Sequence, residues 1–389
     1  MMRLTQRTLS QPSSPIGAHA HLIDELPDDK PLLDLSQGAP GFPPAPEVAD
    51  RMAAVAHHPD GSRYTPLLGL AHLREAFARE LSDRYSGKVH SDDICVTAGC
   101  NQAFAMVTSA LAEPGDEIIL PVPYYFNHDM WLGLDGVVPR YLHPADGLNP
   151  TVEEAEGLVR PNTRAIVLVS PGNPSGHILS PRTLADFAGW ATRRGIVLII
   201  DETYRSFVPG NAPPHDLFHD DAWREHVVSL HSFSKDLAIP GQRVGAIVAS
   251  PVLLAEVAKL IDCVTICAPR SGQEAAHAGL TEAREWRDAK VAEIAEKQAR
   301  FMQVMESEPG GFVLLSAGAY YGWVRHPFAG RATTEVVEKL LVEQGVLTIP
   351  GTAFMPEDEQ MIRFSFANAE IDRLDELATR LRELSRSSP

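Results

Sequence analysis

The sequence predicts an α/β protein: a mostly parallel seven-stranded sheet sandwiched by helices, followed by a second, smaller α+β domain. The chain has 389 residues and 44% of them are hydrophobic, which suffices for a large core and for more than one domain. From about residue 65 to 280, short apolar runs alternate with amphipathic helical segments, and this order is typical of a parallel sheet covered on both faces. After about residue 280 the pattern changes to one long helix, a few short strands and two further helices.

The strands of the large sheet are predicted where short, continuous apolar runs occur, such as "AIVLVS" and "GIVLII". These runs give seven strands at residues 93–98, 116–123, 137–143, 164–170, 196–201, 226–233 and 243–250. The segments between them have helical apolar spacing and give helices at residues 70–85, 101–112, 125–135, 151–159, 180–195 and 252–261.

The second domain is predicted from the region after the large sheet. Residues 281–305 form one long helix with one apolar face, which we expect to link the two domains. Strands at 312–317, 320–326 and 361–367 and helices at 333–345 and 370–384 follow. We therefore expect an N-terminal arm at 1–30, a large domain at 47–279, and a small domain made of 31–46 and 280–389.

Charge and composition exclude several classes of function. The net charge of −17 argues against nucleic-acid binding, which needs a basic surface. The apolar runs are too short to span a membrane, and the N-terminus lacks the apolar core of a signal peptide. The four cysteines, Cys95, Cys100, Cys263 and Cys267, fit a reducing cytoplasm and do not complete a zinc pattern. We expect a cytoplasmic protein without a metal site.

Polar residues follow four of the predicted strands. Because the carboxyl ends of parallel strands share one edge of a sheet, these residues should meet there. They are, in chain order, Gly99, Cys100 and Asn101; Asn173; Asp201 and Tyr204; and Ser232, Ser234, Lys235 and Arg243.

The chemistry of these residues is coherent. A glycine at a helix start, together with Ser232 and Arg243, suits a phosphate. Lys235 beside it is a candidate for a Schiff base, and a buried Asp201 needs a cationic partner such as a protonated ring nitrogen. Phosphate, aldehyde and pyridinium together describe pyridoxal 5′-phosphate (PLP). Each of these residues could instead have a structural role, as part of a turn, as a helix cap, as a core tyrosine or as a surface charge. Their expected position at one edge of the sheet favours a functional site.

From about residue 33 onward the chain resembles the class I/II aminotransferases, a family of fold-type I PLP enzymes that includes aspartate aminotransferase. The motifs that carry the resemblance are "TAGCNQAF", "PYYFNHD", "SPGNPSG", "DETY" and "SFSKDLAIPGQRVG". The resemblance implies that Lys235 is the Schiff-base lysine, that Ser232 and Arg243 bind the phosphate, and that Gly99, Cys100 and Asn101 form the phosphate-binding helix start. It also implies that Asn173 and Tyr204 bind the phenolic oxygen of PLP and that Asp201 binds its ring nitrogen. Tyr125 is expected to stack on the ring, with Tyr124 and Phe126 as alternatives.

Three further matches concern the substrate and a partner subunit. "IRFSFA" resembles the segment whose arginine clamps the substrate α-carboxylate, which implies Arg363, and we expect Asn173 of "SPGNPSG" to bind the substrate as well. "LSQGAPGFPPAP" implies that the backbone of Gly38 approaches that carboxylate. "RYTPLLGLAHLREA" implies that Tyr64 reaches the phosphate of a neighbouring subunit, and hence a homodimer with shared active sites.

The chain also departs from the family pattern. Met355 and Pro356 follow "PGTAF", where glycine is usual. Arg270 and Ser271 stand where relatives often carry a small polar stretch that crosses the dimer. Either departure could alter the wall of the pocket.

The function implied is ping-pong transamination between an L-amino acid and a 2-oxo acid. A PLP-dependent C–S lyase or an aminocyclopropane-carboxylate-synthase-like enzyme is the main alternative, and a non-catalytic binding protein is a remote one. The sequence leaves the substrate open, since Arg270 is the one candidate for a second carboxylate clamp that we can place. Six aromatic residues either favour a substrate with an aromatic or long apolar side chain or belong to the core or the domain interface: Tyr124, Phe126, Trp131, Tyr320, Tyr321 and Trp323.

Overall fold

The computed structural model describes residues 2–18, 20–26, 30–210 and 212–387. Its large sheet is seven-stranded and mostly parallel, as predicted, and only β8 runs antiparallel to its two neighbours. The strand order is β2-β8-β7-β6-β5-β3-β4. The bounds are β2 (Ile94–Thr97), β3 (Glu117–Pro121), β4 (Val138–Leu142), β5 (Thr163–Val169), β6 (Val197–Asp201), β7 (Val227–Ser232) and β8 (Gly245–Val248).

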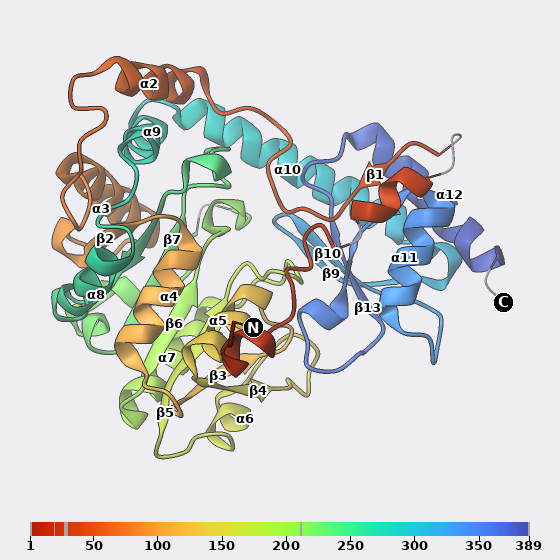
Figure 1. Cartoon of the computed structure of the whole chain (residues 1–389), viewed down its shortest axis with the longest axis horizontal. Coiled ribbons are helices and arrows are strands. Elements are labelled where there is room, and N and C mark those ends of the chain that lie inside the picture. Colours follow the sequence, from red (N-terminus) through yellow and green to blue (C-terminus); the bar gives the residue numbers. More distant parts are fainter. Residues whose placement is uncertain (1, 19, 27–29, 211, 388–389) are drawn as a thin grey trace.

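Helices cover both faces of this sheet (Figure 1). They are α3 (Ala71–Tyr85), α4 (Cys100–Leu111), α5 (Phe126–Asp135), α6 (Val152–Glu156), α7 (Pro181–Arg194) and α8 (Pro251–Val264). Successive residues of a strand enter different cores: Ile166 packs in the cluster that includes α3 and α7, and Val167 in the one that includes α4 and α8. Burial on both faces explains why the strands read as continuous apolar runs.

Helices α2 (Pro46–His57) and α9 (Arg270–Thr281) were not predicted, and they pack against each other. The buried face of α9 consists largely of alanine and glycine, which give little hydrophobic signal. The glycines permit close approach, because a Cβ on Gly279 would lie 2.6 Å from Leu237 and one on Gly272 would lie 2.5 Å from the carbonyl oxygen of Gln242. Helix α9 therefore supports the segment that carries Lys235.

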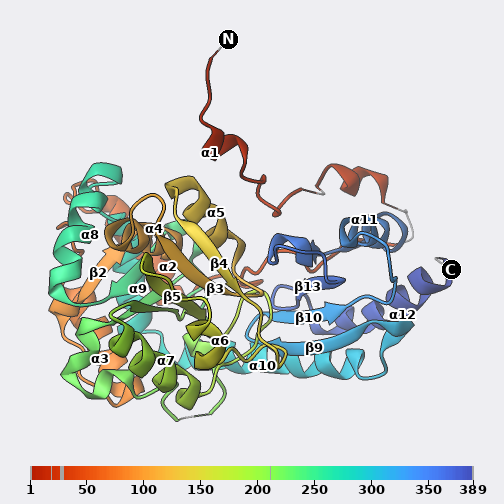
Figure 2. The ribbon, with the colours of Figure 1, turned by 90° about the horizontal axis from the view of Figure 1, so that it is seen from below.

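A second, smaller domain is built on a four-stranded antiparallel sheet with the order β12-β13-β10-β9. The long helix α10 (Arg284–Met305) runs alongside both parts (Figures 1 and 2). The other elements are β9 (Val313–Gly318), β10 (Tyr321–Arg325), α11 (Thr333–Gln344), β12 (Ile349–Pro350), β13 (Met361–Ser365) and α12 (Ile371–Ser387).

The segment before α2 joins the small domain. Strand β1 (Leu33–Asp34) pairs with β11 (Val346–Leu347), and the amide of Ser365 donates to the carbonyl oxygen of Leu35. This pairing agrees with the expectation that 31–46 and 280–389 form one unit, although the boundaries themselves stay a prediction. Short 3₁₀ helices complete the structure: η1 (Ala20–Glu25), η2 (Ser91–Asp93), η3 (Arg205–Phe207), η4 (Leu217–His219), η5 (Asp221–Glu225), η6 (Pro240–Gln242), η7 (Pro309–Gly311) and η8 (Gly351–Ala353).

The N-terminal arm carries a one-turn helix, α1 (Gln6–Leu9), that contacts α5 before the chain runs on to the small domain. In Figure 2 its first residues extend away from both domains. No helix in the described ranges is long and apolar enough to cross a membrane.

Candidate active site

Asp201 is the last residue of β6 and is 4% exposed. Its carboxylate accepts hydrogen bonds from the amide of Thr203 (3.0 Å) and, weakly, from the thiol of Cys100 (3.7 Å), and Nε2 of His128 lies 3.2 Å from Oδ2. Burial alone would raise the pKa of Asp201, but the contacts with His128 and Thr203 outweigh it and hold the pKa below its usual value. Burial, and after it the same carboxylate, raise the pKa of the Cys100 thiol. Asp201 is thus a buried, ionised carboxylate.

His128, on the first turn of α5, is a site residue that sequence reasoning missed. Its ring stacks on Phe104 with the centroids 3.9 Å apart and meets the ring of Tyr125 edge-on at 5.1 Å. The available signal was its spacing, since His128 follows Tyr125 by three residues and so faces the same side of a helix.

Of the three aromatic candidates in this segment, Tyr125 is the one beside His128. Its hydroxyl donates to the side chain of Asn127 at 2.8 Å, which also accepts from Asn101 at 3.1 Å. Tyr124 is buried in the core and stacks on Tyr141 at 5.4 Å. The position of Tyr125 agrees with a ring-stacking role, which stays a prediction.

Lys235 lies just after β7, among buried neighbours. Its Nζ donates to the carbonyl oxygen of Gly38 at 2.5 Å, and the hydroxyl of Tyr320 donates to its own carbonyl oxygen at 3.1 Å. Burial and the positive charges of Arg363 and Arg243 lower the pKa of Lys235 to about 8. Near neutral pH this amine therefore loses its proton far more readily than an ordinary lysine does.

A cradle of main-chain and cationic groups lies at the start of α4. Gly99 has φ of +90° and precedes the helix, whose first-turn N–H groups are available to an anion. The positive φ favours glycine, and a Cβ on Gly99 would lie 2.2 Å from Nη2 of Arg243, so the Arg243 side chain would have to move. Arg243 is exposed, and Ser232 is buried at the end of β7, where its hydroxyl accepts from the amide of Ser234 at 3.2 Å.

Arg363 is 1% exposed and lies on β13 in the small domain. It donates to the side chain of Asn173 at 2.9 Å and to the carbonyl oxygen of Ser36 at 2.5 Å. Its guanidinium lies over the rings of Tyr321 (4.8 Å) and Phe354 (4.9 Å). Within the described part of the chain, its buried Nε has no hydrogen-bond partner. A guanidinium held this rigidly, with a donor to spare, suits a carboxylate.

Tyr321 joins the site more closely than the sequence indicated. Its hydroxyl is hydrogen-bonded to that of Tyr204, and both rings are buried. Gly38 lies against it, because a Cβ on Gly38 would stand only 1.9 Å from the Tyr321 hydroxyl oxygen. The structure thus requires a glycine at position 38 to make room for Tyr321.

Tyr64 and the residues that depart from the family pattern lie partly at the surface and partly against other segments of the chain. Tyr64 is 74% exposed, and a residue that reaches into a partner subunit would be exposed in a single chain. Ser271 donates to Gln242 in the lysine segment at 3.2 Å, and Arg270 lies 3.9 Å from Glu274 on α9. Met355 packs in a cluster that also holds Phe126, Trp323 and Phe354, and Pro356 is exposed.

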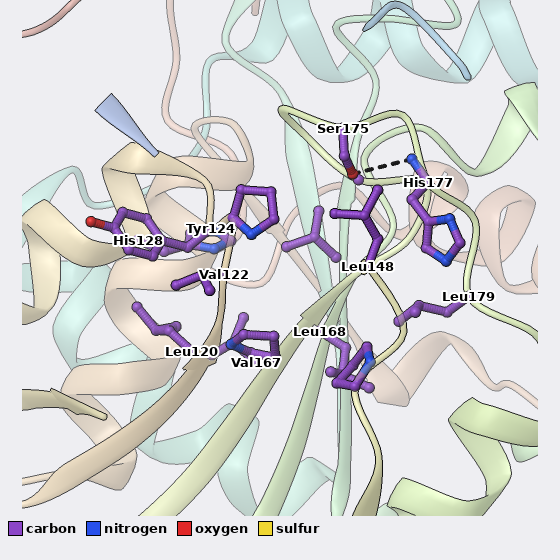
Figure 3. Close-up of a pocket in the computed structure, with 15 residues that line it drawn as sticks. Leu120, Val122, Tyr124, His128, Leu148, Val167, Leu168, Ser175, His177 and Leu179 are labelled. Atoms are coloured by element: carbon purple, nitrogen blue, oxygen red, sulfur yellow. Dashed lines mark hydrogen bonds between the residues drawn. The ribbon is translucent and has the colours of Figure 1, made fainter. Parts of the chain in front are cut away.

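A small cavity lies behind His128, between the ends of β3 and β5 (Figure 3). Tyr124 and His128 line one side, Ser175 and His177 the other, and leucine and valine side chains most of the rest. The amide of His177 donates to the hydroxyl of Ser175 at 3.2 Å. The volume of about 50 Å³ suits a few water molecules, so this cavity is not the amino-acid pocket.

Comparison with known proteins agrees with this geometry. The profile of the family described as "Aminotransferase class I and II" matches residues 30–381. The chain belongs to this family. It is therefore an enzyme of the aminotransferase type, and members of the family use PLP.

The chain is 28% identical over 371 residues to an aspartate aminotransferase of Pyrococcus abyssi, covering 94% of each protein. It is 29% identical over 392 residues to the aromatic aminotransferase ISS1 of Arabidopsis thaliana, covering 98% of this chain and 95% of that protein. Among solved structures, an aminotransferase from Mycobacterium tuberculosis superposes with a TM-score of 0.90 at 26% identity and covers 100% of both chains. These similarities confirm the fold and the class of enzyme and leave the substrate of this aminotransferase to be determined.

Proposed function

We propose that this aminotransferase moves an amino group between an L-amino acid and a 2-oxo acid by a ping-pong mechanism, with PLP attached as a Schiff base to Lys235. The observation that carries the proposal is the environment of the Lys235 amine. Burial and the nearby positive charges of Arg363 and Arg243 lower its pKa to about 8, and the carbonyl oxygen of Gly38 accepts its hydrogen bond.

The residues present fit PLP. The cradle at Gly99, with Arg243 and Ser232, offers hydrogen-bond donors and a cation to a phosphate. Asp201 offers a buried carboxylate to a protonated ring nitrogen, and Lys235 offers an amine to an aldehyde. When bound, PLP supplies an aldehyde that condenses with amines and a pyridine ring that accepts electrons from the Cα–H bond.

The side chains of this protein would bind the substrate, orient it and transfer its Cα proton. Arg363 would hold the substrate α-carboxylate, because its bond from Nη1 to Asn173 orients the guanidinium and its Nε has no partner in the described structure. Lys235 would take the proton from Cα, a task that its lowered pKa suits. The carbonyl oxygen of Gly38 would hold the Lys235 amine when the lysine is unattached. Tyr125 and Phe354 would exclude water with their rings.

We also propose a homodimer with shared active sites, in which Tyr64 donates to the phosphate held by its partner. The exposure of Tyr64 supports this, since a tyrosine that is 74% exposed in a single chain is accessible to another chain. The domain boundaries at 31–46, 47–279 and 280–389 belong to the same proposal, with α10 as the link.

The attachment of PLP can be tested directly. Purified protein is incubated with PLP and reduced with borohydride, and its peptides are mapped by mass spectrometry. We expect the added mass on the peptide that contains Lys235, and none in Lys235→Ala. Lys259→Ala is the matched control, since Lys259 is an exposed lysine paired with Glu256. Attachment at any other lysine contradicts the proposal.

The reaction type and the donor can be tested together. The loaded protein is mixed with single amino acids, and the visible spectrum is followed without a second substrate. A transaminase converts the bound cofactor to its amino form, whereas a C–S lyase or a synthase returns it unchanged. Because relatives are named for aspartate and for aromatic amino acids, the panel begins with aspartate, glutamate, phenylalanine, tyrosine and tryptophan.

A further inference from the structure

The hydroxyl of Tyr204 has a protein partner that the proposed function does not use. The hydroxyl groups of Tyr204 and Tyr321 are hydrogen-bonded to each other, and both residues are nearly inaccessible to solvent, at 3% and 2% exposure. They come from different domains, Tyr204 from the loop after β6 and Tyr321 from the start of β10. The contact therefore crosses the domain boundary inside the site.

Each hydroxyl has one proton, so the direction of this hydrogen bond is decided by what else the two groups must do. If Tyr204 donates to the phenolic oxygen of PLP, its proton is engaged there and its oxygen is left as an acceptor. Tyr321 then has to be the donor of the pair. A donor at the oxygen of Tyr204 polarises its O–H bond and strengthens the bond that Tyr204 makes in turn.

The surroundings of Tyr321 favour donation. The guanidinium of Arg363 lies 4.8 Å from the centre of the Tyr321 ring, and a cation over the ring draws electron density from it. Gly38 packs so closely that a Cβ there would reach within 1.9 Å of the Tyr321 oxygen, and this contact holds the hydroxyl in place. The other titratable groups whose charge acts on the pair are Asp201 and Tyr125.

We propose that Tyr321 is a positioning residue that acts through Tyr204. Its hydroxyl donates to Tyr204 and thereby strengthens the hold of Tyr204 on the phenolic oxygen of PLP. This inference rests on the proposed function. It assigns a specific task to a residue that the sequence placed only among possible wall or core aromatics.

The consequence can be measured without turnover. A strong donor stabilises negative charge on the phenolic oxygen, and the nitrogen that joins PLP to Lys235 then holds its proton less tightly. The visible band of the bound cofactor therefore changes at a lower pH. Removing one neutral hydrogen bond at that oxygen, as in Tyr204→Phe, should raise the midpoint of this spectral pH titration by about 0.5–1 pH unit. Tyr321→Phe should raise it by part of this, at least about 0.2 pH unit.

The experiment is a spectrophotometric pH titration of the PLP-loaded protein in four forms: native, Tyr204→Phe, Tyr321→Phe and the double variant. We expect the double variant to have the same titration midpoint as Tyr204→Phe, because Tyr321 acts only through the Tyr204 hydroxyl, which both variants lack. Tyr141→Phe is the control, since the Tyr141 hydroxyl donates to Asp129 at 2.7 Å in another part of the large domain. Its midpoint should be native.

Two results would overturn the inference: a native midpoint in Tyr321→Phe, or a shift that Tyr321→Phe adds undiminished to that of Tyr204→Phe. These failures are distinct from a failure of the proposed function. If PLP gives no visible band, or borohydride fixes it away from Lys235, the proposed function is wrong. If the band forms at Lys235 and its midpoint is indifferent to Tyr321, only the role of Tyr321 is wrong.

Discussion

Replacing Asp201 with asparagine separates the charge of this residue from its shape. In the native protein, Oδ1 accepts from the amide of Thr203 at 3.0 Å and Nε2 of His128 lies 3.2 Å from Oδ2. An asparagine can keep the first contact with its carbonyl oxygen and present its amide group to His128. His128 can accept there by carrying its proton on Nδ1, which has no partner in the described structure. We therefore expect Asp201→Asn to fold.

The loss should appear in the chemistry instead. The pKa of Asp201 lies below its usual value, so the native carboxylate is ionised throughout the neutral range and can keep the PLP ring nitrogen protonated. A hydrogen bond to a charged group contributes about 1.5–3 kcal/mol, and the upper part of that range corresponds to about a hundredfold in rate. We expect the transamination rate of Asp201→Asn to fall by at least about a hundredfold, while PLP still binds.

The assay is single-turnover conversion of the bound cofactor by a reactive amino acid, followed by stopped-flow absorbance. Asp262→Asn, a change at an exposed residue of α8, is the matched control and should react at the native rate. A PLP analogue with a permanent positive charge on the ring nitrogen should restore part of the lost rate. If Asp201→Asn reacts at the native rate, Asp201 only caps the turn at Thr203 and the reasoning about the strand ends is wrong.

Three further predictions concern the lysine, the arginine and the partner subunit. The rate at which cofactor-free protein captures PLP should rise with pH to a plateau, with a midpoint near the Lys235 pKa of about 8. The unfolded chain keeps the Lys235 proton up to about pH 10.5, so the free energy of unfolding of the cofactor-free protein should increase between pH 8 and pH 10.5, which thermal melts can check. Arg363→Ala should weaken amino-acid reactivity by about 3–5 kcal/mol in kcat/KM and leave the PLP spectrum intact, so an unchanged kcat/KM would remove Arg363 from the site. Tyr64→Phe should loosen PLP, measured by equilibrium dialysis, and its mixed dimers with Lys235→Ala should contain one intact site; mixtures that recover no activity would refute the shared site.

Much of the fold was determined by local sequence pattern. The strands of the large sheet were predicted because burial on both faces demands continuous apolar runs, and seven of them were found. The pattern failed for α9, whose packing face is made of alanine and glycine. There, close approach to Leu237 and Gln242 rather than apolar area selects the residues.

The candidate site was determined by sequence as far as it lies at the ends of strands. Asp201, Ser232 and Lys235 could be placed on one edge because the carboxyl ends of parallel strands lie side by side, whatever the loops do. The sequence also marked Arg363, but only by resemblance, since no periodicity brings a strand of the small domain to this edge.

Only the tertiary structure decided which groups meet across long separations. Arg363 bonds to Asn173, 190 residues away, and to Ser36, 327 residues away. The approach of His128 to Asp201 and of Tyr321 to Tyr204 likewise depends on how separately formed elements pack. Local pattern reports which face of an element is buried, because that follows from the period of the chain. It does not report which other element covers that face, because that depends on shape and volume complementarity between surfaces that come together only in the folded chain.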